Sequence, residues 1–145
     1  MKYTCTVLIK KPIQEVVDLW SDESYFNQWQ DGFKSSTLLS GIANTEGAKS
    51  KLILNDKRYI ELIETIITSN LPHEKTALYE HSHMTNTQSS KFKAIDEHTT
   101  EYTSEVEYIK FNGLFITLIA KLFPKKFKAQ SQKWMDQFKT FSESK

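Results

Sequence analysis

Residues 100–108 read Thr-Glu-Tyr-Thr-Ser-Glu-Val-Glu-Tyr, and they show the clearest alternation in the chain. Every second residue from Thr100 to Tyr108 is uncharged, whereas the residues between them are three glutamates and one threonine. Successive side chains of a strand point to opposite faces of a sheet. The pattern therefore predicts a strand of an antiparallel sheet with one wet face and one covered face.

Five further stretches of strand character precede this one, and short polar separators containing Asn, Gly, Pro or His divide them. Separators of this length and composition join neighbouring strands as antiparallel hairpins. With an additional N-terminal strand at residues 2–10, we expect a sheet of six to seven strands. The five stretches cover residues 33–41, 48–55, 58–69, 75–84 and 88–96.

The N-terminal strand is followed by helical patterns. Pro12 suits the first position of a helix, where its missing N–H group costs nothing, and an apolar stripe continues to Trp20. Ser21 or Asp22 can cap a second short helix, which ends at the turn residues Asp31-Gly32. We therefore expect two short helices after the first strand.

The remainder of the chain, from Gly113, reads as a long amphipathic helix that Pro124 must kink or restart. It is the only element long enough to cover the dry face of the sheet. The predicted fold class is α+β, a single domain over residues 1–145 in which a curved antiparallel sheet wraps a long C-terminal helix. The expected stripe consists of Phe115, Leu118, Ile119 and Leu122, followed by Phe127, Gln130, Trp134, Phe138 and Phe141.

Composition excludes several classes of function. The net charge is +1 and Arg58 is the only arginine, so we expect no nucleic-acid partner, because readers of bases and phosphates rely on arginine. A single cysteine, Cys5, forbids an internal disulfide and suits the reducing cytoplasm. The N-terminal apolar run is too short for a signal peptide, and no stretch approaches the ~18 apolar residues of a membrane span. The sequence predicts no cofactor.

Three segments resemble the START-like superfamily of helix-grip proteins, which includes polyketide cyclase/dehydrase-type proteins. The first is the strand that ends at Ile9 and leads into EVVDLWSDESYFNQW, where Asp22 and Trp29 occupy the positions of the superfamily's Asp and closing Trp. The second is ELIETII with SNLP, which contains Glu64 and Pro72. The third is the helix interrupted by proline at the end of the chain.

The resemblance implies that the sheet leaves a cavity against the helix and that the cavity binds a lipid, an isoprenoid, a polyketide-like compound or another hydrophobic molecule. A cyclase- or dehydratase-type enzyme on the same cavity, and a membrane- or protein-docking module, remain alternatives. The protein would be a monomer or a homodimer. We expect the cavity to be lined by Trp20, Tyr59, Tyr79, His81, Phe92, Tyr102, Phe115, Ile119, Gln130, Trp134 and Phe138.

No catalytic signature or metal site is predicted. His81 and His83 share a face if residues 75–84 form one strand, but no Cys or HExxH spacing supplies further zinc ligands. We favour the register with Ala77 facing the cavity, and the opposite register, with Leu78 inside, stays open. The segment IELIETII is apolar on both faces, so periodicity does not say which of Glu61 and Glu64 points inward, where it could act as a general acid or base.

Charge is distributed unevenly along the chain. Residues 1–109 hold 11 basic and 16 acidic residues, whereas residues 110–145 hold 8 lysines and 2 acidic residues. The segment GLFITLIAKLFPKKFK joins apolar residues to lysines, a composition found in interfacial helices. We interpret it as a core helix with a solvated basic face, and a membrane-surface contact through this segment is the alternative.

Overall fold

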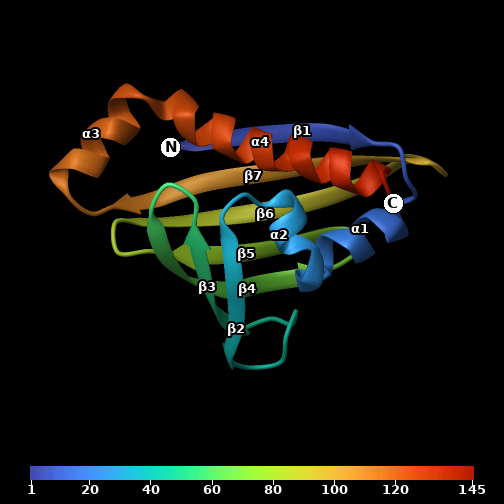
Figure 1. Ribbon diagram of the computed structural model, residues 1–145, viewed down its shortest axis with the longest axis horizontal. Helices are drawn as coiled ribbons and strands as arrows, with labels where there is room; N and C mark the ends of the chain where they lie inside the picture. Colours follow the sequence, from blue (N-terminus) through green and yellow to red (C-terminus); the bar gives the residue numbers. More distant parts are fainter.

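A curved seven-stranded antiparallel sheet forms the frame of the protein (Figure 1). The computed structural model describes residues 1–145. The spatial order of the strands is β1-β7-β6-β5-β4-β3-β2, so the first strand pairs with the last. The strands are β1 (Lys2–Ile9), β2 (Phe33–Ser40), β3 (Lys49–Asn55), β4 (Tyr59–Asn70), β5 (Glu74–Glu80), β6 (Met84–Asp96) and β7 (Thr99–Phe111).

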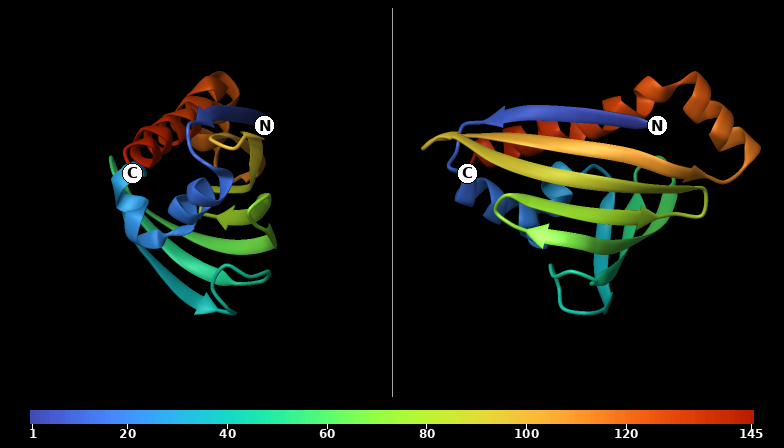
Figure 2. Two further views of the ribbon diagram at one scale, coloured as in Figure 1. Left: turned by 90° about the vertical axis from the view of Figure 1, so that its right-hand side faces the viewer. Right: turned by 180° about the vertical axis from the view of Figure 1, so that it is seen from behind.

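The helices lie on the concave side and at the ends of this sheet. Seen along its length, the sheet curves beneath the C-terminal helix and turns its concave face toward that helix (Figure 2). This is the expected helix-grip arrangement of a curved sheet and a long C-terminal helix, with short helices after the first strand. The helical elements are α1 (Ile13–Ser21), the 3-10 turn η1 (Glu23–Tyr25), α2 (Phe26–Trp29), α3 (Leu114–Leu122) and α4 (Pro124–Glu143).

The alternation in β7 is confirmed. Tyr102, Ser104 and Val106 are buried on the concave face, whereas Glu105 and Glu107 are exposed on the convex face. The Glu105 carboxylate lies 2.9 Å from the Lys91 ammonium of β6. Exposed ion pairs of this kind contribute little stability, so the burial of the concave face holds the strand in its register.

Local chemistry explains where two of the helical elements, η1 and α4, begin. Asp22 accepts a hydrogen bond from the Ser24 backbone N–H at 3.0 Å and thereby caps η1. Pro124 occupies the first turn of α4, where proline is tolerated. The C-terminal helix therefore restarts at Pro124, and α3 is a separate helix that projects from one end of the sheet (Figure 1).

Two strand boundaries differ by four residues from the sequence-based prediction. Strand β5 ends at Glu80, so His81 and His83 lie in the β5–β6 turn and not on a strand. Strand β6 begins at Met84, whereas the sequence predicts a loop over residues 85–87. The polar residues of early β6 pair fully with β5, for example Asn86 with Tyr79. Pairing on both sides compensates for their low strand propensity.

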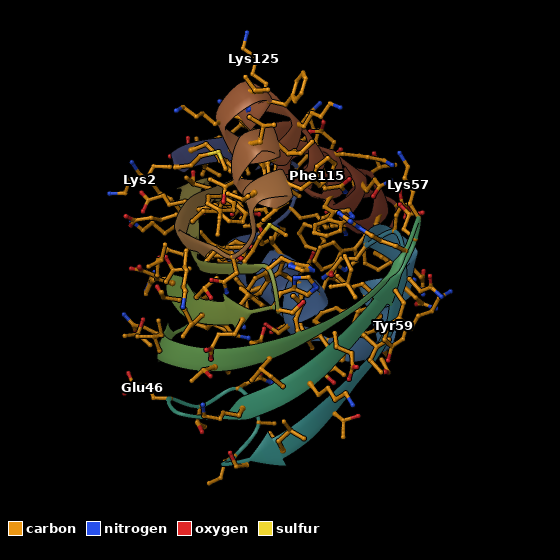
Figure 3. All side chains as sticks on the ribbon, turned by 90° about the vertical axis from the view of Figure 1, so that its left-hand side faces the viewer. Lys2, Glu46, Lys57, Tyr59, Phe115 and Lys125 are labelled. Atoms are coloured by element: carbon orange, nitrogen blue, oxygen red, sulfur yellow. The ribbon has the colours of Figure 1, made fainter.

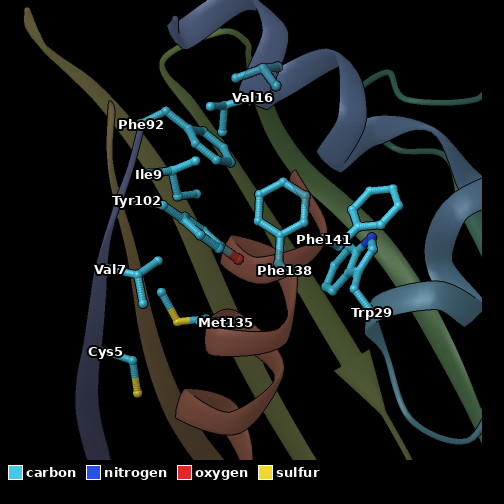
Figure 4. Packing of buried hydrophobic residues seen from close by; sticks show 11 residues of the cluster. Cys5, Val7, Ile9, Val16, Trp29, Phe92, Tyr102, Met135, Phe138 and Phe141 are labelled. Carbon is cyan, nitrogen blue, oxygen red and sulfur yellow. The ribbon is translucent and has the colours of Figure 1, made fainter. Parts of the chain in front are cut away.

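The hydrophobic core occupies one end of the molecule, where α1 and α4 meet β1 and β7. Phe138 and Ile9 are fully buried, and the Phe138 ring lies 5.0 Å from that of Trp29, edge to face (Figure 4). Phe92 stacks on Tyr102 with ring centroids 4.8 Å apart. Each such side chain contributes roughly 1.5–3 kcal/mol through burial. This cluster anchors α4 firmly at its C-terminal end.

None of the helices combines the length and the apolarity that crossing a membrane requires.

Candidate functional site

A cavity of about 450 Å³ lies between the concave face of the sheet and the helices. This volume falls within the range of small-molecule sites, about 300–1,000 Å³. Of the 34 residues that line it, 19 are hydrophobic. The cavity is therefore mainly apolar, with enough polar groups to orient a bound molecule.

Strand pairing brings polar side chains together in the floor of the cavity. Asn86, Tyr79 and Glu64 are direct neighbours on β6, β5 and β4, and all three side chains line the cavity. Tyr108 of β7 pairs with Asn86 and extends the same row. Gln88 lies two residues further along β6 and also lines the cavity. A band of polar groups thus crosses a floor whose flanking residues, such as Leu62, are apolar.

Glu64 and Tyr79 form the central polar contact of this row. The Tyr79 hydroxyl donates a hydrogen bond to Glu64 Oε2 at 2.8 Å. Burial, reinforced by the adjacent Glu64 carboxylate, raises the pKa of Tyr79 well above its usual value. Tyr79 is consequently a permanent donor at neutral pH. The remaining lone pairs of the carboxylate stay available to a donor on a ligand.

The question of which glutamate of β4 points inward is thereby resolved. Glu64 faces the cavity, whereas Glu61 is on the convex face with its carboxylate 2.7 Å from the Lys51 ammonium. The favoured register is also confirmed for residues 75–80, because Lys75 and Tyr79 line the cavity and Ala77 is buried between them.

The roof and one wall come from the helices. Trp134 and Gln130 of α4 line the cavity, as does Ile119 of α3. On the α1 side the Trp20 indole N–H donates to the Tyr102 hydroxyl at 3.2 Å. Burial raises the pKa of Tyr102 above its usual value. Tyr102 therefore stays neutral in the wall, where its hydroxyl accepts from Trp20 and can itself donate.

Cationic and imidazole groups gather at the end of the cavity that carries α3. Arg58 in the β3–β4 turn, His81 in the β5–β6 turn and Lys126 of α4 all line the cavity there. Burial, followed by the nearby His83 and Arg58, lowers the pKa of His81. His81 and His83 have ring centroids 5.5 Å apart, and no cluster of three or more His, Cys, Asp or Glu side chains forms around them.

Seven of the eleven expected cavity residues line the cavity, although their contact with a ligand stays a prediction. These seven are Trp20, Tyr79, His81, Tyr102, Ile119, Gln130 and Trp134. Sequence reasoning missed Asn86, which it placed in a loop, and Gln88, which it placed in a strand without assigning it to the cavity. It left Glu64 undecided. The placement expected for the other four was wrong.

Two of the four misplaced residues lie on the surface. Tyr59 is 57% exposed, and its label in Figure 3 stands on the outer side of the sheet. Its neighbour Ile60 lines the cavity instead, because β4 pairs with β3 through Ile60 and Leu54 on the concave face. Phe115 is 74% exposed, because α3 turns Ile116 and Ile119 toward the cavity.

The other two misplaced residues, Phe92 and Phe138, belong to the hydrophobic core and not to the cavity wall. Both rings contact Tyr102, whose ring centroid lies 4.8 Å from that of Phe92 and 6.0 Å from that of Phe138 (Figure 4). Their aromatic area stabilises the wall without contributing surface to it.

Comparison with known proteins supports the fold. No family model and no curated protein sequence matches this chain. Solved structures do match over nearly its full length. A protein of Thermus thermophilus has a TM-score of 0.80 at 12% identity, covering 99% of this chain and 98% of its own.

Two further matches carry descriptive names. The Zhui aromatase/cyclase of a Streptomyces species has a TM-score of 0.81 at 7% identity, covering 99% of this chain and 93% of its own. The protein Ara h 8.0201 has a TM-score of 0.76 at 11% identity, covering 100% of this chain and 99% of its own. The chain therefore has the helix-grip fold that its sequence indicated.

Proposed function

We propose that residues 1–145 act as one unit that binds or carries a hydrophobic small molecule in the cavity between the sheet and α4. The observation that carries this proposal is the apolar cavity of about 450 Å³ with the Glu64–Tyr79 pair in its floor. Apolar area supplies most of the binding energy, at roughly 25 cal/mol per Å² removed from water. The polar row sets the orientation of the bound molecule.

The distribution of polar atoms supports an oxygenated ligand. Glu64 offers a carboxylate to a hydroxyl or amine of the ligand. The amide side chains of Asn86, Gln88 and Gln130 also line the cavity and can donate to or accept from oxygen atoms of a ligand. Among lipids, isoprenoids and polyketide-like molecules, a compound with hydroxyl or carbonyl groups therefore fits better than a hydrocarbon.

Catalysis on the same cavity is a second candidate, favoured by the same buried contact. Glu64 is a half-buried carboxylate in a mainly apolar cavity, and a carboxylate held beside a substrate can serve as a general base. The aromatase/cyclase among the structural matches shares the fold. Glu64→Gln separates the two functions, because it abolishes turnover by an enzyme but changes the affinity of a carrier only modestly.

The remaining parts of the proposal concern location and partners. The single cysteine, Cys5, is buried and unpaired, which supports a reducing cytoplasmic location. With Arg58 as the only arginine, we propose no nucleic-acid partner. We propose a monomer or a homodimer without a cofactor.

The first test is native mass spectrometry of the protein purified from its own host, followed by organic extraction. A stoichiometric hydrophobic compound would support the proposal and identify the chemistry to assay. Displacement of a fluorescent hydrophobic probe by that compound should then saturate at one molecule per chain. An unliganded mass together with no saturable probe binding would contradict the proposal.

A further inference from the structure

Helix α3 is apolar on two opposite sides. Its inner side turns Ile116, Ile119 and Ala120 toward the protein, where the first two line the cavity. Its outer side is also apolar, but the side chains there are more than half exposed to solvent. A helix that is hydrophobic all round is normally enclosed by protein or lipid.

The outer side forms a compact patch, which we call the α3 patch and define as Leu114, Phe115, Leu118 and Leu122. These residues follow the spacing of one helical face, with steps of three and four residues. Leu114 is 93% exposed and Phe115 is 74% exposed, and the other two are more than half exposed. Surface leucines that occur singly need no explanation, whereas a contiguous patch marks an interaction site.

Lysines adjoin the patch, and no acidic residue lies near it in sequence. Lys121 is in the last turn of α3, and Lys125, Lys126 and Lys128 follow in the first turns of α4. From residue 108 to residue 135 the chain contains no Asp or Glu. The segment from α3 to the start of α4 is therefore apolar at its tip and positively charged behind it. Figure 3 shows this end, with Phe115 and Lys125 labelled on α3 and α4.

We propose that the α3 patch docks on an anionic lipid bilayer. The four apolar side chains would enter the boundary between headgroups and acyl chains, and the lysines behind them would pair with lipid phosphates. This combination of an apolar face and flanking lysines is the physical basis of interfacial binding. Charge complementarity distinguishes this occupant from a second copy of the chain, because two copies would bring their lysine clusters together.

Docking in this position would also place the cavity against the bilayer. The inner side of α3 lines the cavity together with Arg58, His81 and Lys126. Backbone contacts hold the helix at this end, since the Asn112 N–H donates to the His83 carbonyl at 2.8 Å. A hydrophobic molecule could then pass between bilayer and cavity without crossing much water. Docking itself does not depend on the proposed ligand.

The test is sedimentation of the full chain with vesicles of phosphatidylcholine that contain 30% phosphatidylglycerol. We expect binding to these vesicles, at least tenfold weaker binding to pure phosphatidylcholine, and progressive release as salt rises, because salt screens exposed charges. The double variant Phe115→Ser/Leu118→Ser should reduce binding at least tenfold. The matched control is Leu38→Ser/Leu39→Ser, which removes two exposed leucines of β2 far from α3 and should bind as the parent does.

A second pair of variants tests the charges. Lys121→Gln/Lys125→Gln should weaken binding to anionic vesicles at least fivefold, whereas Lys34→Gln/Lys93→Gln, at exposed sites on β2 and β6, should not. Equal vesicle binding by the parent and both α3-region variants would overturn the proposal. So would a concentration-dependent dimer that Phe115→Ser/Leu118→Ser dissociates, because the patch would then be covered by a second copy. Absence of binding to any vesicle would overturn it as well.

Discussion

The hydroxyl of Tyr79 donates to the carboxylate of Glu64 across adjacent strands at 2.8 Å, and both side chains face the cavity. Since the Tyr79 side chain lies in the floor of the cavity, its hydroxyl has little access to bulk water as an alternative partner. The contact thus contributes to the stability of the sheet and also belongs to the candidate site.

Loss of the Tyr79 hydroxyl should destabilise the protein. Tyr79→Phe removes the hydrogen bond to the half-buried Glu64 carboxylate, and such a bond contributes about 0.5–1.5 kcal/mol. Glu64→Gln in the Tyr79→Phe background should recover part of that loss, because a neutral amide is less costly to bury than a charge. The free energy of unfolding in urea measures both effects. Tyr59→Phe, on the exposed convex face, is the control and should leave stability unchanged.

Alkaline pH should unfold the protein through its buried tyrosines. Burial raises the pKa of Tyr79, Tyr102 and Tyr108 above the usual value of 10.0. Between pH 10 and the folded-state pKa values, the unfolded chain releases these protons and the folded chain retains them. Stability is therefore complete below about pH 10 and falls as pH rises above it.

Unfolding midpoints in urea between pH 8 and pH 11.5 measure this decline. Tyr79→Phe should show a shallower decline than the parent, whereas Tyr59→Phe should match the parent. Comparing variants removes the contribution of the lysines, which titrate in the same range. Identical slopes for all three proteins would show that Tyr79 is not protected from ionisation.

Two glycines with nearly the same backbone angle should tolerate alanine very differently. Gly32 has a φ of +85° and Gly47 a φ of +83°, so alanine strains both by about 1–2 kcal/mol. A Cβ at Gly32 would lie 2.7 Å from the Cβ of Asp56, whereas one at Gly47 meets nothing within 4 Å. Overpacking costs about 1–3 kcal/mol more. Thermal unfolding should therefore show Gly32→Ala to be clearly less stable than Gly47→Ala, and equal losses would refute the close approach.

How far the sequence predicts this structure depends on whether a segment is apolar on one face or two. Strand β7 alternates cleanly, so its buried face follows directly from the pattern. The segment IELIETII of β4 carries apolar residues on both faces, and only its pairing with β3, such as Leu62 opposite Leu52, decides that Tyr59 points outward. The same ambiguity arises in α3, because apolar residues lie on two opposite sides of this helix. Its orientation is set by its packing against α4 at the edge of the cavity, which the pattern alone does not contain, so the predicted side of Phe115 is wrong.

The polar floor of the cavity explains why the start of β6 is predicted as a loop. The sequence predicts a loop over residues 85–87 because Thr-Asn-Thr lacks apolar residues. In the structure Asn86 faces a cavity and not a packed core, and a cavity tolerates polar side chains that a core would exclude. The segment that least resembles a buried strand is therefore part of the candidate site, where local sequence rules are expected to fail.

Filling the cavity should abolish ligand binding without unfolding the protein. Leu52 and Ile53 are adjacent in β3, but Leu52 lines the cavity and Ile53 faces the convex side opposite Glu61. Leu52→Trp places an indole in empty space, so it should weaken binding of the extracted compound, or of a fluorescent hydrophobic probe, at least tenfold. Stability should be equal or higher, because the indole buries apolar area that the parent leaves open to the cavity.

Ile53→Trp is the matched control, since it adds the same side chain to the same strand on the opposite face. It should bind the probe with the affinity of the parent. Fluorescence titration measures the affinities, and urea unfolding verifies that both variants are folded. If the two variants bound the probe equally well, the molecule would occupy another surface. Because the α3 patch is untouched in both variants, loss of probe binding by Leu52→Trp with vesicle binding intact would show that the cavity and the docking surface act separately.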